Sequence, residues 1–338
     1  MKNLTLKDIA TALDLSITTV SKALKDYPDV NINTKEKVKS YAKKVNFTPN
    51  THAAYLRTHQ SKLVGVVIPR LNHFFFSNVL RGIMYAAEKE DYMVIVLSSD
   101  ESYELEKKQI NRLLQQNVDG ILLSIADSTH NTKHIDAIIE QKIPLIFFDK
   151  YSKLSNCSSI VIDDQKAAFI AVEHLIKQGE KNIAHLRGPL LPQNSIDRFL
   201  GFRKALEQYG LEYRSEWVFT CDQISNEEGY AYTQEIIEKY PEIDAIFAVA
   251  DMPAVGAIKC LNERKIAIPE QIAVMGFSNW RISNLVTPTL STINQPGFEM
   301  GEKAFEMFYK EQQLIKKGEI IQFQKIELDT DLIIRQST

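Results

Sequence analysis

Two hydrophobic patterns divide the chain near residue 60. Before this point, apolar residues recur at helical spacing in short segments. Val38, Tyr41, Ala42 and Val45 follow the i, i+3, i+4, i+7 stripe of an amphipathic helix. From Leu63 onward, short runs of consecutive apolar residues alternate with helical stretches. The pattern predicts a small all-α domain followed by a larger α/β region.

Nine of the apolar runs have the composition of strands that are buried on both faces. They cover residues 63–68, 93–98, 120–125, 144–148, 159–162, 182–186, 217–220, 245–250 and 272–277. Strands of this type that alternate with helices are typical of parallel sheets. Nine such strands are more than one sheet of this kind usually holds. We therefore predict two doubly wound parallel-sheet lobes within a ligand-binding and dimerisation core, residues 62–338. The expected N-lobe holds about 62–163 and 294–322, and the C-lobe about 164–293 and 323–338.

Residues 6–24 predict a helix, a tight turn and a second helix. Ala10 is small where two helices must cross closely, and Val20 faces the first helix. Ser16 is a favourable N-cap for the second helix. Asp14 falls in the turn, where aspartate tolerates a left-handed conformation better than most residues. The arrangement predicts a helix-turn-helix.

The outer face of the second helix offers groups that can read DNA. Thr18, Ser21 and Lys22 can hydrogen-bond to base edges or phosphates in the major groove, and Ile17 can touch a thymine methyl group. The alternative is a small helical bundle whose solvated basic face docks a protein. We predict that residues 1–48 form a DNA-binding headpiece.

Residues 49–61 are predicted to form a hinge helix and linker. Pro49 ends the preceding helix and can open a new one of about eight residues, which is below the roughly 12 to 15 that stay helical in water. Such a segment can be disordered alone and helical when it packs against a partner copy in the DNA minor groove. Leu56 is suited to wedge between base pairs there.

The charge distribution agrees with a polyanion at the N-terminal end. The chain has 338 residues and a formal net charge of −3, but residues 1–60 carry ten cations and five carboxylates. That end has a charge of +5 and the remainder −8. The three cysteines lie far apart without metal-ligand spacing, and neither a signal peptide pattern nor an apolar stretch of about 18 residues occurs. We expect a cytoplasmic protein with no membrane association.

These motifs together resemble the lactose/galactose repressor family of bacterial transcription regulators. The resemblance runs over essentially the whole chain, with matching motifs in the same order at residues 5–10, 16–22, 46–50, 53 and 56, 118–121, 275–277, 287–288 and 295–296. It implies an operator-binding headpiece, a hinge helix and a regulatory core like a periplasmic sugar-binding protein. It also implies a homodimer, and two-fold symmetry requires a near-palindromic operator.

The resemblance implies a set of DNA contacts in the headpiece and hinge. These are Thr5, Leu6, Ser16, Ile17, Thr18, Thr19, Ser21, Lys22, Asn50, Ala53 and Leu56. The base-reading positions fall on Ile17, Thr18 and Lys22, which vary within the family, so the operator sequence stays open. Lys22 stands where many members carry arginine, which disfavours bidentate reading of guanine.

Candidate effector-binding residues follow the apolar runs, because ligands bind beyond the carboxyl ends of parallel strands. They are Phe75, Phe76, Asp149, Asn194, Arg198, Asp251, Ser278 and Gln295. Aromatic faces, carboxylates, amides and a guanidinium are the chemistry of sugar recognition, although they also suit a heterocycle. The two phenylalanines can equally belong to the core, and Asp163 fits a helix cap better than a ligand contact.

The resemblance places the family's effector arginine at Arg198. Two departures limit what it implies about the effector. Ser278 stands where the family commonly has aspartate, and Pro192 where the purine-binding branch has arginine. Together they disfavour a purine, and the first puts the usual sugar geometry in doubt.

No pattern of an enzyme occurs: GxGxxG, Walker A, GxSxG and HExxH are absent and the seven histidines are scattered. We expect no catalytic site, cofactor or metal. The sequence favours a repressor of carbohydrate-use genes whose operator affinity is set by a sugar. Alternatives are a purine, nucleoside or sugar-phosphate effector, an added protein corepressor, or a sugar-binding or sugar-modifying protein without a regulatory role.

Overall fold

The computed structural model describes residues 4–45, 47, 60–71, 73–153 and 155–338. The chain forms two compact units, Met1–Ser61 and Lys62–Thr338. Each unit has its own hydrophobic core. The hinge helix that the sequence predicts falls almost wholly on residues outside the described part of the chain.

The described residues of the first unit form three helices, α1 (Leu6–Leu13), α2 (Ile17–Leu24) and α3 (Ile32–Lys44). They pack around a small core of buried aliphatic side chains, formed by Ile9, Ala10, Val20, Ala23, Val38 and Ala42. The helical stripe predicted around Val38 and the small residue predicted at the helix crossing, Ala10, are therefore confirmed.

Local signals fix the ends of the first two helices. Thr5 and Asp8 form a capping box at the start of α1, and the Ser16 hydroxyl accepts a hydrogen bond from the Thr19 backbone N–H at the start of α2. Asp14 has a φ of 55° in the turn between the two helices. Both the predicted N-cap and the predicted left-handed turn residue are confirmed.

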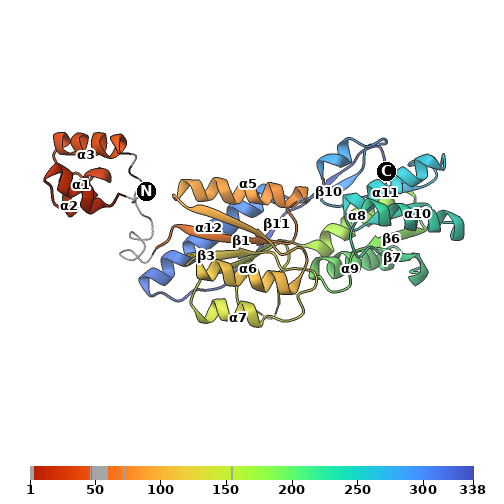
Figure 1. Cartoon of the computed structure of the whole chain (residues 1–338). Helices are drawn as coiled ribbons and strands as arrows, with labels where there is room; N and C mark the ends of the chain where they lie inside the picture. Colours follow the sequence, from red (N-terminus) through yellow and green to blue (C-terminus); the bar gives the residue numbers. More distant parts are fainter. Residues whose placement is uncertain (1–3, 46, 48–59, 72, 154) are drawn as a thin grey trace. The chain divides into compact units, whose positions relative to one another are not determined.

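The N-lobe of the second unit is built on a six-stranded parallel sheet in the order β11-β5-β4-β3-β1-β2. Its strands are β1 (Leu63–Ile68), β2 (Met93–Ser98), β3 (Gly120–Leu123), β4 (Leu145–Phe148), β5 (Ser158–Ile162) and β11 (Lys325–Leu328). Figure 1 shows helices on both faces of this sheet, with α5 (Phe74–Lys89) and α12 (Gly297–Lys317) on one face. The other face is covered by α6 (Tyr103–Gln115) and α7 (Lys133–Glu140).

The C-lobe is built on a four-stranded parallel sheet in the order β7-β6-β8-β9. Its strands are β6 (Ile183–Arg187), β7 (Val218–Thr220), β8 (Ala245–Ala248) and β9 (Ala273–Met275). One face packs against α8 (Asp164–Gln178) and α9 (Gln193–Gln208), and the other against α10 (Asn226–Lys239) and α11 (Asp251–Glu263). All nine predicted strands are present, and the fold class of two parallel-sheet α/β lobes is confirmed.

The return of the chain through the lobe junction differs from the prediction. Residues 323–338 were expected to belong to the C-lobe, but β11 pairs with β5 and forms the edge of the N-lobe sheet. The strand that returns is β12 (Asp331–Ile333), which pairs antiparallel with β10 (Thr292–Asn294). The chain therefore crosses between the lobes three times, after β5, after β10 and after β11.

One hydrophobic cluster extends through both lobes, since it holds residues of α5, α12, α8 and β9 together. The lobes are thus packed against each other near the crossings as well as connected by them. Among the described residues, no helix has the length and apolar character needed to span a membrane.

Candidate effector site and DNA-binding face

A cavity of about 570 Å³, part of which is open to solvent, lies between the two lobes of the core. Seven of the eight predicted effector residues line it: Phe75, Phe76, Asp149, Asn194, Arg198, Ser278 and Gln295. They lie in helices and loops that follow strands of both sheets, and in the crossing after β10. Ligands commonly bind at this edge, beyond the carboxyl ends of parallel strands. The structure thus brings together side chains that lie 220 positions apart, from Phe75 to Gln295.

Arg198 is a fixed part of the cavity wall. It lies in the second turn of α9 and is buried; its Nε donates to Asp164 Oδ1 at 2.7 Å and a terminal nitrogen donates to the Val249 carbonyl at 2.9 Å. The guanidinium also lies 3.8 Å from the centre of the Phe277 ring. Burial raises the pKa of Asp164 to about 6, although Arg198 opposes the rise. The guanidinium is therefore held in one orientation at the cavity wall.

Asp149 supplies an acid with few partners to the same cavity. It follows β4 with a φ of 59° and is half-buried, and the Ser124 hydroxyl lies 3.5 Å from its Oδ2. Burial raises the pKa of Asp149 to about 7, while Lys150 acts in the opposite direction. Near neutral pH this carboxyl group can both accept and donate a hydrogen bond.

Three lining residues have buried polar atoms without a hydrogen-bond partner among the described residues. These atoms are His73 Nδ1, Ser195 Oγ and Gln295 Nε2. Ser195 is 4% exposed and Gln295 is 7% exposed, so solvent reaches neither side chain freely. An unpaired buried polar group costs about 1–3 kcal/mol. A ligand with hydroxyl groups in the cavity would satisfy these atoms.

The sequence did not single out a buried ion cluster at one end of the cavity. Lys150 Nζ lies 2.8 Å from Glu101 Oε2 and 2.5 Å from Asp127 Oδ1, and all three residues line the cavity. Burial raises the pKa of Glu101 despite the lysine, and the two carboxylates raise the pKa of Lys150 despite its burial. The signal was available, because all three residues follow strands β2, β3 and β4 directly or within a few positions.

Asp251, the eighth predicted effector residue, is not among the residues that line the cavity. It is fully buried at the start of α11, where its two oxygens accept hydrogen bonds of 2.6 Å from the Trp280 backbone N–H and the Thr292 hydroxyl. Burial raises its pKa to about 7. Asp251 instead positions Trp280, whose ring meets the edge of the His73 ring from the other lobe at 4.1 Å between centroids.

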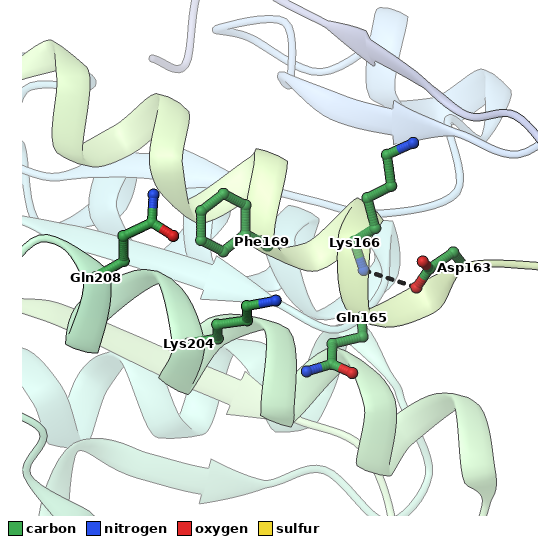
Figure 2. A pocket seen from close by; sticks show the side chains of 6 residues that line it. All are labelled: Asp163, Gln165, Lys166, Phe169, Lys204 and Gln208. Carbon is green, nitrogen blue, oxygen red and sulfur yellow. Dashed lines mark hydrogen bonds between the residues drawn. The ribbon is translucent and has the colours of Figure 1, made fainter.

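The two phenylalanines belong to the core and also face the cavity. Phe75 and Phe76 are each 4% exposed, belong to the large core cluster and line the cavity. Asp163, in contrast, caps a helix: its Oδ1 accepts a hydrogen bond of 2.9 Å from the Lys166 backbone N–H at the start of α8. Figure 2 shows this bond at a pocket between α8 and α9, and none of the residues that line this pocket lines the interlobe cavity.

In the first unit, the predicted DNA contacts cluster at the start and outer side of α2. Ile17 is 47% exposed, Thr18 is exposed, and Ser21 is half-buried. Lys22 forms an ion pair with Asp29. Ser16 and Thr19 are hydrogen-bonded to each other through their hydroxyls at 2.8 Å.

The other predicted contacts have different surroundings. Thr5 takes part in the capping box of α1, and Leu6 packs against the small core. Asn50, Ala53 and Leu56 lie outside the described residues.

A helix-turn-helix with an exposed outer face and a two-lobed core with a polar cavity between its lobes define a ligand-responsive DNA-binding regulator. Residues 61–330 match the model of periplasmic binding proteins and the sugar binding domain of the LacI family, and residues 5–50 match that of bacterial regulatory proteins of the lacI family. The chain therefore belongs to the LacI family of bacterial transcription regulators. Proteins of this family bind operator DNA and small effectors and work as dimers.

Curated relatives align with the chain from end to end. Catabolite control protein A of Priestia megaterium is 29% identical over 337 residues, which is 99% of both chains. The ribose operon repressor of Halalkalibacterium halodurans is 29% identical over 334 residues, 99% of this chain and 97% of that protein. Both are regulators of transcription and not enzymes, which agrees with the expectation from the sequence.

Solved structures support the same fold. The Lac repressor dimer bound to operator and the anti-inducer ONPF superposes with a TM-score of 0.87, at 24% identity and over 99% of both chains. The complex of the transcriptional regulator CelR with cellobiose gives a TM-score of 0.75, at 23% identity, over 99% of this chain and 100% of that one.

Proposed function

We propose that the protein is a cytoplasmic, homodimeric repressor of carbohydrate-use genes, and that a neutral sugar in the interlobe cavity sets its affinity for operator DNA. One observation carries the choice of ligand. Ser195 and Gln295 place unpaired polar atoms at a buried wall, beside a carboxyl group with a pKa of about 7 at Asp149. Several hydroxyl groups on one small scaffold match this mixture of donors and acceptors.

The charges of the cavity argue against a phosphorylated effector. Lys150 is neutralised by Glu101 and Asp127, and Arg198 is paired with Asp164, so carboxylates match both cations. A phosphate group would have to displace one of these carboxylates and desolvate its own charge. The ribose operon named for one relative and the cellobiose in one related structure also support a sugar.

On the DNA side, we propose that α2 lies in the major groove and that Ile17, Thr18 and Lys22 read the bases. The remaining proposed contacts are Thr5, Leu6, Ser16, Thr19 and Ser21 in the headpiece and Asn50, Ala53 and Leu56 in the hinge. The exposure of Ile17 and Thr18 supports this assignment, because side chains that belong to the core of the headpiece are buried and cannot reach DNA.

The effector assignment is tested by replacing an unpaired group with an apolar one of similar shape. Gln295→Leu removes the unsatisfied Nε2, so the melting temperature of the free protein should stay unchanged or rise. The same variant should bind the sugar about 10- to 100-fold more weakly, as measured by isothermal titration. A thermal-shift screen of monosaccharides, disaccharides, sugar phosphates and purines identifies the sugar first.

Gln312→Leu is the matched control. Gln312 is also buried, but it donates to Asp119 at 3.1 Å and accepts from Lys316 at 2.8 Å, and it does not line the cavity. This variant should lower the melting temperature and leave the sugar affinity intact. Stabilisation of the wild type by purines or phosphates alone would contradict the neutral sugar, and gel shifts with duplexes from the gene's own promoter test repression.

A further inference from the structure

A second compartment with an empty volume of about 720 Å³, part of which is open to solvent, adjoins the interlobe cavity. We call this the outer compartment. Asp127, Lys150 and Pro192 line both spaces. The remaining wall comes from loops of the N-lobe, residues 125–132 and 150–153, and from residues 191–193 of the C-lobe. Both compartments therefore lie between the same two lobes.

The boundary between the compartments is rigid. Lys150 is buried and held by two carboxylates, with Nζ at 2.8 Å from Glu101 and 2.5 Å from Asp127. The Asp127 backbone N–H also donates to Glu101 at 2.8 Å, which ties the loop after β3 to the same cluster. Lys150 is thus held at the boundary, and a ligand that occupies both compartments would pass beside it.

Both walls of the outer compartment mix polar and apolar groups, since Ile125 and Tyr151 lie on the N-lobe side and Gln193 on the C-lobe side. Thr129, Asn131 and Thr132 supply hydroxyl and amide groups, and the Asn131 side chain is oriented by a hydrogen bond of 2.8 Å that its Oδ1 accepts from the Tyr103 hydroxyl. Apolar surface comes from Leu191, which is 66% exposed, and from Pro192. A pyranose ring has this same mixture, with hydroxyl groups at its rim and C–H groups on its face.

We infer that the effector has two sugar rings, one in the inner cavity and the second in the outer compartment between Asn131 and Leu191. This inference rests on the proposed sugar effector. A single ring can satisfy Ser195 and Gln295 in the inner cavity, but it leaves the exposed Leu191 side chain in water. The second ring covers Leu191 and meets the oriented amide, so affinity depends on both compartments.

The test compares sugars of one and two rings with the full-length protein. Isothermal titration is performed with glucose, galactose and fructose and with maltose, cellobiose, lactose and sucrose. We expect one disaccharide to bind at least tenfold more tightly than either of its component monosaccharides. A monosaccharide that binds as tightly as any disaccharide would overturn the inference but leave the proposed sugar effector intact, whereas binding of no sugar would overturn both.

Two neighbouring leucines provide the variants. Leu191→Ala should weaken disaccharide binding three- to tenfold and change monosaccharide binding less than twofold. Leu190→Ala is the control, because Leu190 is 61% exposed but lines neither compartment. Both side chains are exposed, so neither variant should disturb folding. Equal effects of the two substitutions on disaccharide affinity would overturn the placement of the second ring.

Discussion

At the scale of single residues, the cavity differs from the surrounding core in how its polar groups are paired. Asp251 and Gln312 are buried and hydrogen-bonded on two sides, as buried polar groups usually are. Ser195 and Gln295 are equally buried and Asp149 is half-buried, but all three lack comparable partners among the described residues. The missing partners lower the unfolding free energy of the free protein, and a bound ligand can supply them. The part that comes from Asp149 should depend on pH.

Asp149 makes this cost measurable. Its pKa in the folded protein, about 7, lies above its ordinary value of 3.8, so the folded state holds the proton more tightly. Its contribution to stability is complete below about pH 4 and is lost as the pH rises through about 7. Asp149→Asn should therefore lose less unfolding free energy between pH 5 and pH 8 than the wild type, by about 1–3 kcal/mol. Urea denaturation of the ligand-free protein at both pH values measures this difference.

Asp163→Asn is the control for the change in charge. Asp163 is an exposed helix cap, and asparagine caps helices equally well, so its pH dependence should match that of the wild type. Asparagine also tolerates the left-handed conformation of residue 149, whose φ is 59°. If the wild type and Asp149→Asn lost the same free energy over this pH range, the pKa of Asp149 would not be raised in the folded protein.

At the scale of elements, sequence patterns predict the strands that are buried on both faces and miss a strand that is partly exposed. The nine buried strands are runs of consecutive apolar residues, whereas β11 reads Lys-Ile-Glu-Leu and sits at an edge with three of its four side chains at least partly in solvent. The site shows the same limit. Asp251 and Lys150 both follow strands closely, and only the tertiary packing decides that Lys150 lines the cavity and Asp251 lies behind it.

In the headpiece, a carboxylate competes with DNA for a lysine of α2. Lys22 is paired with Asp29, so a proposed base-reading side chain already has an anionic partner. Asp29→Asn should release the lysine and strengthen operator binding about two- to fivefold at low salt. Because the freed ammonium group enters the field of the DNA phosphates even when it reads a base, the plot of log affinity against log salt should become steeper by up to about 1, the value for one neutralised phosphate. Gel shifts or fluorescence anisotropy at four salt concentrations measure both quantities.

Asp14→Asn removes the same charge from the same unit without releasing Lys22. Asp14 lies in the turn with a φ of 55°, a conformation that asparagine tolerates. Its effect on the salt dependence gives the contribution of net charge alone, and it should be smaller than that of Asp29→Asn. Identical effects would show that Lys22 gains no contact and that Asp29 acts only through long-range repulsion.

At the scale of the whole molecule, an effector in the cavity touches both lobes of the core. The lobes also touch each other directly beside it, through the rings of His73 and Trp280 and through a hydrogen bond of 3.3 Å from Arg70 to Gln223. A ligand that binds better to one arrangement of the lobes than to another favours that arrangement. Operator binding by a dimer depends on the same equilibrium if the two activities are coupled.

Coupling of this kind is reciprocal, which gives the last prediction. If saturating sugar changes the operator Kd by a given factor, saturating operator must change the sugar Kd by the same factor, typically about 5 to 150. Titration of sugar with and without the operator duplex, and of operator with and without sugar, measures both sides. A scrambled duplex of equal length should leave the sugar Kd unchanged. Leu56→Ala should weaken operator binding while the sugar Kd without DNA stays the same, and unequal factors in the wild type would show that the titrated sugar site is not the one that controls the operator.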